Sequence, residues 1–443
     1  MSDLKKLEAL LETGKEENIK LALQLSDSQH ITLDLSAYYT FHNWWRQLRP
    51  EVEPVHSPLE LLLSLLNVQV LDLSSLHLKE VPESIACLKN LQALHLSYNY
   101  LTTLPESLGT LENLRFLDLS ENRLEVLPDN LVQLTQLNYL YLYRNQLLAL
   151  PATKTKAWPQ LKVLLLAENR LTALPDYLCA CHKLSVLNVQ KNHLKTLPNK
   201  LGHLKKLKQL NIGDNQLTTL PESLPQCNKL EVLEAPHNRL NKLPERIGLL
   251  KNLVQLNLFN NSLHELPEQL ESLQQLQRLH LGLNRLTQLP HSITQLHALQ
   301  ELTIQNNQIA ALPESIGKLE QLRHLNAARN KLATLPSSMA QLYALQQLNL
   351  DNNNLKKFAL DCSYLIQLQQ LTLAYNQLEQ LPASIAQLKQ LKTLILKQNC
   401  FKLLPLELTQ LSQLTELNAQ DNPLQIQPLL VQSLQEHVSI IVL

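Results

Sequence analysis

The segment LQALHLSYNYLTTLPESLGTLEN, residues 91–113, contains the pattern that decides how this chain folds. It reads Leu-x-Leu-x-x-Asn-x-Leu-x-x-Leu-Pro, followed by a leucine or isoleucine every third residue until the pattern starts again. Sixteen copies run from Val70 to Pro428 with a period of 23 residues. A fixed period of this length predicts stacked supersecondary units, and therefore a solenoid that needs no single central core.

A single copy of the pattern carries three local signals. Leu94 and Leu96 alternate with His95, which predicts a short strand with both leucines facing inward. Pro105 has no amide hydrogen and ends any strand pairing at that point. The apolar residues that then recur every third position suit a 3₁₀ turn or a short helix on the outer face. The expected fold is an α/β solenoid of sixteen repeats.

An asparagine follows the strand in fifteen of the copies, and its chemistry explains its position. The chain turns inward after each strand and leaves buried N–H and C=O groups without a partner in the sheet. An amide side chain can donate and accept hydrogen bonds, so it can satisfy both kinds of group. We therefore predict a structural ladder formed by Asn99, Asn122, Asn145, Asn169, Asn192, Asn215, Asn238, Asn261, Asn284, Asn307, Asn330, Asn353, Asn376, Asn399 and Asn422.

Three repeats depart from the pattern. Repeat 1 has Leu76 where the asparagine belongs, and repeat 13 has Phe358-Ala359 where Leu-Pro belongs. Repeat 5 has one extra residue within PATKTKAWPQ, residues 151–160, and it places Trp158 at a core leucine position. We expect Lys154 and Lys156 of this segment to lie in a solvated loop.

The N-terminal flank, residues 1–58, is expected to form a helical cap. A solenoid needs caps because its two ends would otherwise expose apolar surface. The expected elements are helices over residues 2–12 and 15–25, a strand-like segment over 31–35, and irregular chain containing Trp44 and Trp45 over 36–58. A small separate interaction module is the alternative interpretation of these residues.

The solenoid is expected to span residues 59–428, and residues 429–443 are expected to cap its C-terminal end. The cap consists of a helix from Pro428 to His437 and a final strand. Val438, Ile440 and Val442 alternate in this strand, and the 23-residue spacing places Ile440 opposite Leu417.

Composition and sequence pattern argue against several classes of partner and location. The chain has 39 basic and 39 acidic side chains, whereas a nucleic-acid partner normally calls for a basic surface. The N-terminus has no apolar core of the kind a secretory signal needs, and the longest apolar run, residues 59–66, is too short to cross a membrane. Cys181, Cys227 and Cys362 occupy core leucine positions, which predicts buried free thiols and a cytoplasmic protein.

The sequence contains no arrangement that predicts an enzyme. Seven glycines are too few and too scattered for a phosphate-binding loop. Cys179, Cys181 and His182 resemble a metal cluster, but Cys181 is expected to point into the core and no second ligand pair has zinc spacing. We predict no catalytic residue, no cofactor and no metal.

The pattern in residues 91–113 and its copies resembles the leucine-rich repeat. It is similar to the 23-residue intracellular class found in Ras-suppressor-like and Scribble-like proteins and in many bacterial repeat proteins. The resemblance covers about four fifths of the chain. It implies a curved horseshoe with a parallel β-sheet on its concave side, 3₁₀ turns or short helices on its convex side, and a role as a protein-binding scaffold.

One group of aromatic and apolar residues is predicted to share the concave face of repeats 3 to 5. It comprises Phe116, Tyr139, Tyr141, Tyr143, Val163 and Leu165, with Tyr98 at the margin. Aromatic residues are 4% of the chain, and tyrosine is favoured at interfaces because it buries a large area at low entropic cost. The alternative is cross-strand aromatic pairing that only supports the sheet. A second, weaker candidate group is His237, Phe259, His280 and Leu283 in repeats 8 to 10.

The function predicted from these features is non-enzymatic recognition of a protein or peptide on the concave face. Two alternatives stay open at this point. One is an exported bacterial effector that recruits a host protein. The other is a targeting subunit for a separately encoded enzyme. The sequence does not determine the oligomeric state or the identity of the partner.

Overall fold

The computed structural model describes residues 3–152, 158–425, 427–436 and 438–443. They divide into two compact units, the N-terminal unit Met1–Gln209 and the C-terminal unit Leu210–Leu443. Lys154, Lys156 and His437, on which the sequence made predictions, lie outside the described residues.

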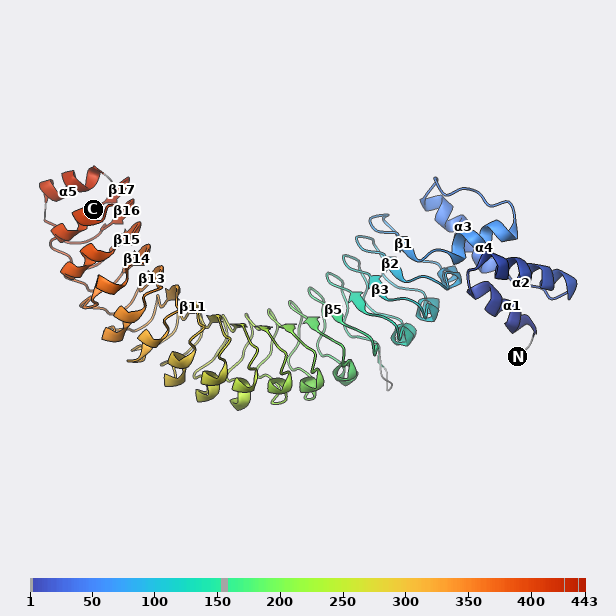
Figure 1. Ribbon diagram of the computed structural model, residues 1–443, viewed down its shortest axis with the longest axis horizontal. Helices are drawn as coiled ribbons and strands as arrows, with labels where there is room; N and C mark the ends of the chain where they lie inside the picture. Colours follow the sequence, from blue (N-terminus) through green and yellow to red (C-terminus); the bar gives the residue numbers. More distant parts are fainter. Residues whose placement is uncertain (1–2, 153–157, 426, 437) are drawn as a thin grey trace. The chain divides into compact units, whose positions relative to one another are not determined.

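The N-terminal unit begins with four α-helices and continues with short strands (Figure 1). Its elements are α1 Asp3–Glu12, α2 Glu16–Ser28, α3 Ser36–Leu48, α4 Pro58–Leu66, β1 Val70–Asp72, β2 Ala93–His95, β3 Phe116–Asp118, β4 Tyr139–Tyr141, β5 Val163–Leu165 and β6 Val186–Asn188. Strand β7, Gln209–Asn211, lies at the boundary of the two units.

The C-terminal unit consists of strands and turns followed by one helix and a last strand. Its elements are β8 Val232–Glu234, β9 Gln255–Asn257, β10 Arg278–His280, β11 Glu301–Thr303, β12 His324–Asn326, β13 Gln347–Asn349, β14 Gln370–Thr372, β15 Thr393–Ile395, β16 Glu416–Asn418, α5 Pro428–Gln435 and β17 Ile440–Val442.

Within each unit the strands are parallel and follow one another in chain order. The central residue of each strand pairs with its equivalent 23 residues later, as Leu94 does with Leu117 and Leu279 with Leu302. The step is 24 between Leu140 and Leu164, because repeat 5 carries its extra residue there. These central leucines are buried, and the residues on either side of them face the opposite way. The predicted parallel strand layer is confirmed.

The 3₁₀ turns lie along the edge opposite the strands (Figure 1). In repeat 2 the turn Glu106–Thr110 starts directly after Pro105, whose ring fixes φ at −67°. Leu108, Leu111 and Leu114 are fully buried between this turn and the strand. Each repeat therefore closes around its own leucines and packs them against the next repeat, which confirms the predicted solenoid.

Two predictions for the N-terminal flank are wrong. Residues 31–35 form no strand, and most of the segment expected to be irregular is the helix α3. Aromatic residues have modest helix propensity, but α3 buries Phe41 and His42 on one face, and tertiary packing outweighs that propensity. The solenoid was expected to begin at residue 59, yet α4 occupies that stretch and the first repeat strand begins at Val70.

The N-terminal helices are packed together and joined to the first repeats. Leu7 and Leu11 of α1, Ile19 of α2 and Leu62 of α4 belong to one buried apolar cluster. The Nδ2 of Asn90 donates hydrogen bonds to the carbonyl oxygens of Glu12 and Leu66, at 3.2 and 2.9 Å. This arrangement is what a cap requires, and the role of residues 1–58 as a cap stays a prediction.

The buried imidazole of His42 predicts that acid destabilises the N-terminal unit. Its side chain is 2% exposed, and burial, helped by the Arg46 charge, lowers the pKa of His42. The unfolded chain titrates near the ordinary histidine pKa of about 6.5. It therefore binds more protons than the folded chain as pH falls through that value, and stability falls with it.

We expect His42→Leu to flatten the pH dependence of unfolding between about pH 7.5 and pH 5.5. The measurement is the urea midpoint of each protein at the two pH values. His203, which is exposed in the same unit, supplies the control substitution His203→Gln. The His203 variant should lose stability on acidification as strongly as the parent. If the His42 variant does so too, the buried imidazole of His42 is not the cause of the effect.

At the C-terminal end, α5 and β17 follow the last repeat, as the sequence predicted. The register of β17 differs from the expected one, because Leu417 pairs with Ile441 rather than Ile440. The step is thus 24 residues. The intervening helix α5 replaces the 3₁₀ turn of an ordinary repeat, so the chain between the strands need not keep the 23-residue spacing.

Candidate functional site

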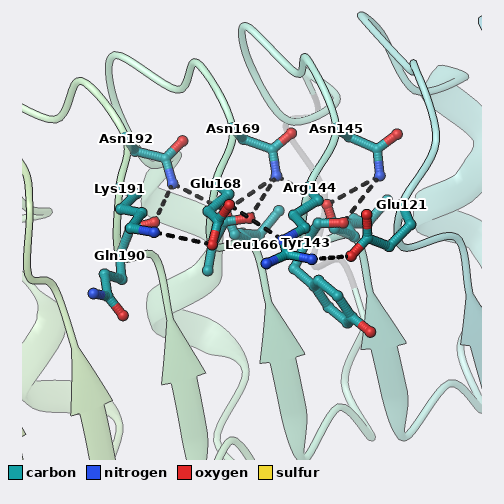
Figure 2. A network of polar contacts seen from close by, with 12 residues as sticks. Glu121, Tyr143, Arg144, Asn145, Leu166, Glu168, Asn169, Gln190, Lys191 and Asn192 are labelled. Atoms are coloured by element: carbon teal, nitrogen blue, oxygen red, sulfur yellow. Dashed lines mark hydrogen bonds and ion pairs between the residues drawn. The ribbon is translucent and has the colours of Figure 1, made fainter.

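The asparagine ladder fixes the turn that follows each strand. The Nδ2 of Asn145 donates to the carbonyl oxygens of Leu119 and Leu142, at 2.9 and 3.2 Å. Its Oδ1 accepts the amide hydrogen of Leu124 at 3.0 Å. Figure 2 shows the amides of Asn145, Asn169 and Asn192 side by side with their carbonyl partners. One side chain thus satisfies backbone groups of its own repeat and of the preceding one.

The residue just before each ladder asparagine adopts a left-handed backbone conformation, which the sequence did not predict. No glycine stands at these positions. They are Tyr98, Glu121, Arg144, Glu168, Lys191, Asp214, His237, Asn260, Leu283, Asn306, Arg329, Asn352, Tyr375, Gln398 and Asp421, with φ between 51° and 59°. The asparagine hydrogen bonds hold the turn in this conformation, which most side chains disfavour. We call this row the left-handed column.

In the N-terminal unit the left-handed column carries alternating charges that pair with one another (Figure 2). Arg144 contacts Glu121 on one side and Glu168 on the other, with 3.2 Å from its Nε to the Glu168 Oε2. Lys191 Nζ lies 3.2 Å from the Glu168 Oε1. The hydrogen bond that Lys191 donates lowers the pKa of Glu168, and the hydrogen bond that Arg144 donates to Glu121 raises the pKa of Arg144. The opposite charges along this margin of the strand face therefore largely cancel.

Beside this margin, the strands β2 to β4 bring aromatic rings together. The Phe116 ring lies 6.1 Å from Tyr139 and 5.2 Å, edge to face, from Tyr141. His95 of β2 lies 4.7 Å from Phe116 on the other side. We call these four residues the aromatic cluster. The rings meet because their strands pair in register, Phe116 opposite Tyr139 and His95 opposite Asp118.

The cluster is partly open to solvent and has an acidic neighbour. Tyr139 is 37% exposed, and Phe116 and Tyr141 are half-buried. Burial raises the pKa of Tyr141, and nearby Tyr139 and Asp118 add to the effect, so its hydroxyl is a neutral hydrogen-bond donor. The carboxylate of Asp118 accepts two hydrogen bonds from Ser120 through one oxygen. The arrangement offers a rigid apolar surface with polar groups at its edge.

The other residues of the first predicted group lie around the cluster without ring contacts. Val163 and Leu165 are the strand partners of Tyr139 and Tyr141 on β5, so they extend the same face. Tyr143 follows β4, and its ring points away from the asparagine ladder in Figure 2. Tyr98 is 57% exposed in the left-handed column.

Sequence reasoning left His95 out of the group. It lies one strand before Phe116 and is the last residue of its strand, as Tyr141 is of β4. The alternation along the strand places His95 on the same face as the aromatic residues. It was left out because its side chain is polar.

The second predicted group forms a looser arrangement in the C-terminal unit. The His237 ring packs edge to face on Phe259 at 5.6 Å, and its Nδ1 is 2.8 Å from the Asn260 Nδ2. His280 instead contacts Thr303, with 3.1 Å from Nδ1 to Oγ1. Leu283 is exposed. The structure thus joins His237 and Phe259 directly, whereas His280 contacts Thr303 and Leu283 is exposed.

All six cysteines are free thiols, and five of them are buried. Burial raises the pKa of Cys87, Cys181 and Cys362 to about 12. In the described residues, no three His, Cys, Asp or Glu side chains gather where they could hold a metal ion. Over the same ranges, no helix combines the length and apolar character needed to cross a membrane.

Comparison with known proteins identifies the repeat. A model of the leucine rich repeat matches residues 66–124, 93–147, 135–194, 182–240 and 366–424, and a model of a leucine-rich repeat region matches residues 280–377. No curated protein sequence matches the chain.

Solved structures of similar proteins come from bacteria and plants. A leucine-rich repeat protein of Leptospira interrogans is 35% identical over 88% of this chain and 99% of its own, with a TM-score of 0.77. The plant peptide hormone receptor RGFR1 in complex with RGF2 is 26% identical over 82% of this chain and 64% of its own, with a TM-score of 0.68.

The Arabidopsis receptor kinase HAESA, solved with the peptide hormone IDA and the co-receptor SERK1, is 26% identical over 81% of this chain and 71% of its own. Its TM-score is 0.60. The repeated pattern, the strand and turn geometry and the matches over most of the chain agree, and the chain belongs to the leucine-rich repeat family.

Proposed function

We propose that this chain is a non-enzymatic recognition protein that binds a protein or peptide on the strand face of its N-terminal unit. The observation that carries the proposal is the aromatic cluster. It gathers Phe116, Tyr139 and Tyr141 on one open face of a chain in which aromatic residues are 4% of the total. Two similar plant proteins are solved with bound peptide hormones, which supports a peptide or protein as the class of partner.

The physical properties of the cluster suit an anchoring role. Its rings are already held against each other, so little side-chain entropy is lost when a partner covers them. Interface energy concentrates in such aromatic anchors, with the surrounding contacts excluding water. Val163 and Leu165 would extend the apolar area, and Tyr98 and Tyr143 would contribute hydroxyl groups at its edge.

We also propose a cytoplasmic location and no nucleic-acid partner. The six free thiols fit a reducing compartment, in which disulfides rarely form. The balanced charge of the chain gives no net attraction for nucleic acid, and the cations Arg144 and Lys191 beside the cluster are engaged with carboxylates.

The double substitution Tyr139→Ala and Tyr141→Ala tests the proposal. A partner recovered from native lysate on the full-length protein is expected to bind the variant at least about 10-fold more weakly, because hot-spot truncations cost about 2 kcal/mol or more. Tyr343 and Tyr364 are also exposed and meet edge to face at 6.1 Å, so alanine at both is the matched control. The measurement is surface plasmon resonance.

The alternative of a purely structural cluster gives a different outcome. Cross-strand aromatic pairs stabilise a sheet by about 0.2–1 kcal/mol each, so the variant would lose stability in urea while its affinity stays that of the parent. Unchanged affinity, or an equal loss in the Tyr343 and Tyr364 control, would remove the aromatic cluster from the proposed function.

A further inference from the structure

The strand face of the C-terminal unit has a depression of about 470 Å³ over β11 to β14. Its floor is formed by the central leucines Leu325 and Leu348, and its sides are almost entirely polar. The polar lining residues are Glu301, Thr303, His324, Asn326, Gln347, Asn349 and Gln370. The chemistry of this surface therefore differs from that of the aromatic cluster.

Two asparagines at the centre of the depression present their amino groups in a fixed orientation. The Oδ1 of Asn326 accepts the amide hydrogen of Ala328 at 3.2 Å, and the Oδ1 of Asn349 accepts that of Asp351 at 3.0 Å. Each oxygen is thus used within its own chain segment. In the described part of the chain neither Nδ2 has a hydrogen-bond partner, so both amino groups remain available as donors.

The spacing of these donors suits a single acceptor group. Asn326 and Asn349 are direct partners on neighbouring parallel strands, which lie about 4.8 Å apart. A carboxylate has two oxygens with about four lone-pair sites, so it can accept a hydrogen bond from each amino group. The side-chain amides of Gln347 and Gln370, at the edge of the depression, can supply further donors.

The repeat that contains β12 adds two uncompensated cations. Arg323 and Arg329 flank the strand at its two ends, both exposed, and neither has an ion-pair partner among the described residues. Arg329 occupies the left-handed column, where its neighbours 23 residues away are Asn306 and Asn352. Arg144 occupies the same column but stands between Glu121 and Glu168.

Arg144 and Lys191 beside the aromatic cluster are thus paired with carboxylates, whereas Arg323 and Arg329 at β12 are not. Two carboxylates lie near the depression, and neither is paired with a lysine or arginine among the described residues. Glu301 lies 3.8 Å from His280, and Asp351 accepts the amide hydrogen of Ala374 at 2.7 Å. The depression thus combines fixed neutral donors with two unpaired arginines, one before and one after β12.

We propose that this depression is a second recognition site, which binds the carboxylate side chains of an acidic peptide segment. Asn326 and Asn349 hold one carboxylate between them, and Arg323 and Arg329 attract acidic residues on either side of it. Two arginines and a set of amides are too little positive charge for the phosphate contacts that nucleic-acid binding requires, which favours a peptide. The site is independent of the aromatic cluster, and its test does not depend on the partner of that cluster.

The experiment measures binding of a fluorescein-labelled octaglutamate peptide to the full-length protein by fluorescence anisotropy. Octaglutamate is expected to bind at least about 10-fold more tightly than octaglutamine, and the difference should shrink as salt is added. Asn349→Asp keeps the Oδ1 acceptor and replaces the donor by a negative oxygen. We expect it to weaken octaglutamate binding by about 10-fold or more.

Asn418 provides a matched control, because its Oδ1 accepts the Gln420 amide hydrogen at 3.1 Å in the same local arrangement on β16. Asn418→Asp should change the affinity by less than about 2-fold, since this residue lies outside the depression. Arg323→Gln with Arg329→Gln changes two exposed side chains and should reproduce the loss without touching the strand.

Four results would overturn the proposal. Octaglutamine could bind as tightly as octaglutamate, or octaglutamate could fail to bind at all. Asn418→Asp could weaken binding as much as Asn349→Asp, which would reduce the effect to net charge. A ten-nucleotide oligothymidylate could bind more tightly than octaglutamate, which would assign the surface to nucleic acid. These results are independent of whether the Tyr139 and Tyr141 variant loses binding at the aromatic cluster.

Discussion

Replacing Asn330 by alanine is expected to lower the free energy of unfolding of the C-terminal unit by about 3 kcal/mol. The Oδ1 of Asn330 accepts the amide hydrogen of Ile309 at 3.0 Å. Its Nδ2 is 3.0 Å from the carbonyl oxygen of Ile304 and 3.1 Å from that of Ala327. The substitution removes the partner of a buried donor and of several carbonyls at once, and each unsatisfied group costs about 1–3 kcal/mol.

The position of Asn330 within the unit should increase the effect. A solenoid is stabilised by its repeats and by the interfaces between neighbours, so damage in the middle weakens two interfaces. Asn422 makes the same kind of contacts near the C-terminal end, where it is only half-buried. Asn422→Ala should therefore cost clearly less than Asn330→Ala. The exposed Asn354 supplies the surface control, for which we expect a change within about 0.5 kcal/mol.

Urea unfolding followed by circular dichroism gives the free energies, and amide hydrogen exchange locates the loss. Protection should fall first at the amide of Ile309 and in the neighbouring turns. If Asn330→Ala unfolds at the same urea concentration as Asn354→Ala, the ladder does not stabilise the repeats, and the explanation of the asparagine by backbone hydrogen bonding fails.

The strands, turns and ladder could be predicted because each is decided within one repeat. Leu94 and Leu96 alternate, Asn99 follows the strand at a fixed distance and Pro105 precedes the 3₁₀ turn, so the same local rules apply in most copies. The irregular parts depend on packing between segments. The helix α3 contains many aromatic residues and forms because Phe41 and His42 are buried against its neighbours. No sequence period reports that burial.

The sequence predicts which residues of the candidate site lie side by side, but it does not predict how their charges pair. In-register parallel strands place equivalent residues of successive repeats side by side, and this brought Phe116, Tyr139 and Tyr141 together. No sequence pattern predicts what Arg144 and Lys191 contact. In the structure they are the pairing partners of Glu121 and Glu168, because the left-handed turn aligns all four in one row.

The residue types in the left-handed column partly indicate its backbone conformation. Six of its fifteen members are asparagine, aspartate or histidine, the residues that adopt this conformation most readily after glycine. The other nine include Tyr98, Arg144 and Leu283, whose side chains give no hint of it. The conformation is imposed by the asparagine that follows, so the neighbour rather than the residue itself carries the information.

Trp158→Ala is the second substitution with a large expected effect, a loss of about 3–5 kcal/mol from the N-terminal unit. The Trp158 ring is fully buried at a position that other repeats fill with leucine. Its Nε1 donates to the carbonyl oxygen of Leu131 at 3.0 Å, and Tyr177 packs edge to face on it at 6.0 Å. That carbonyl also accepts the amide hydrogen of Leu134, so the loss arises mainly from the cavity.

A substitution of Tyr177, which packs against Trp158, should have the opposite effect on stability. The Tyr177 hydroxyl is buried and has no hydrogen-bond partner among the described residues, and burial raises its pKa. Tyr177→Phe removes this group and keeps the ring against Trp158, so stability should stay unchanged or rise by up to about 1 kcal/mol. Trp158→Leu restores the residue type of the other repeats and should fall between the two, because the pocket around repeat 5 is shaped for the larger ring.

Urea unfolding of the three variants separates the contributions. The expected order of stability is Tyr177→Phe, Trp158→Leu and Trp158→Ala, from highest to lowest. If Trp158→Ala lost less than about 1 kcal/mol, the tryptophan would not be what accommodates the extra residue of repeat 5. A loss for Tyr177→Phe as large as that for Trp158→Ala would show that the hydroxyl is bonded in solution, and that polar contacts rather than ring packing hold this repeat.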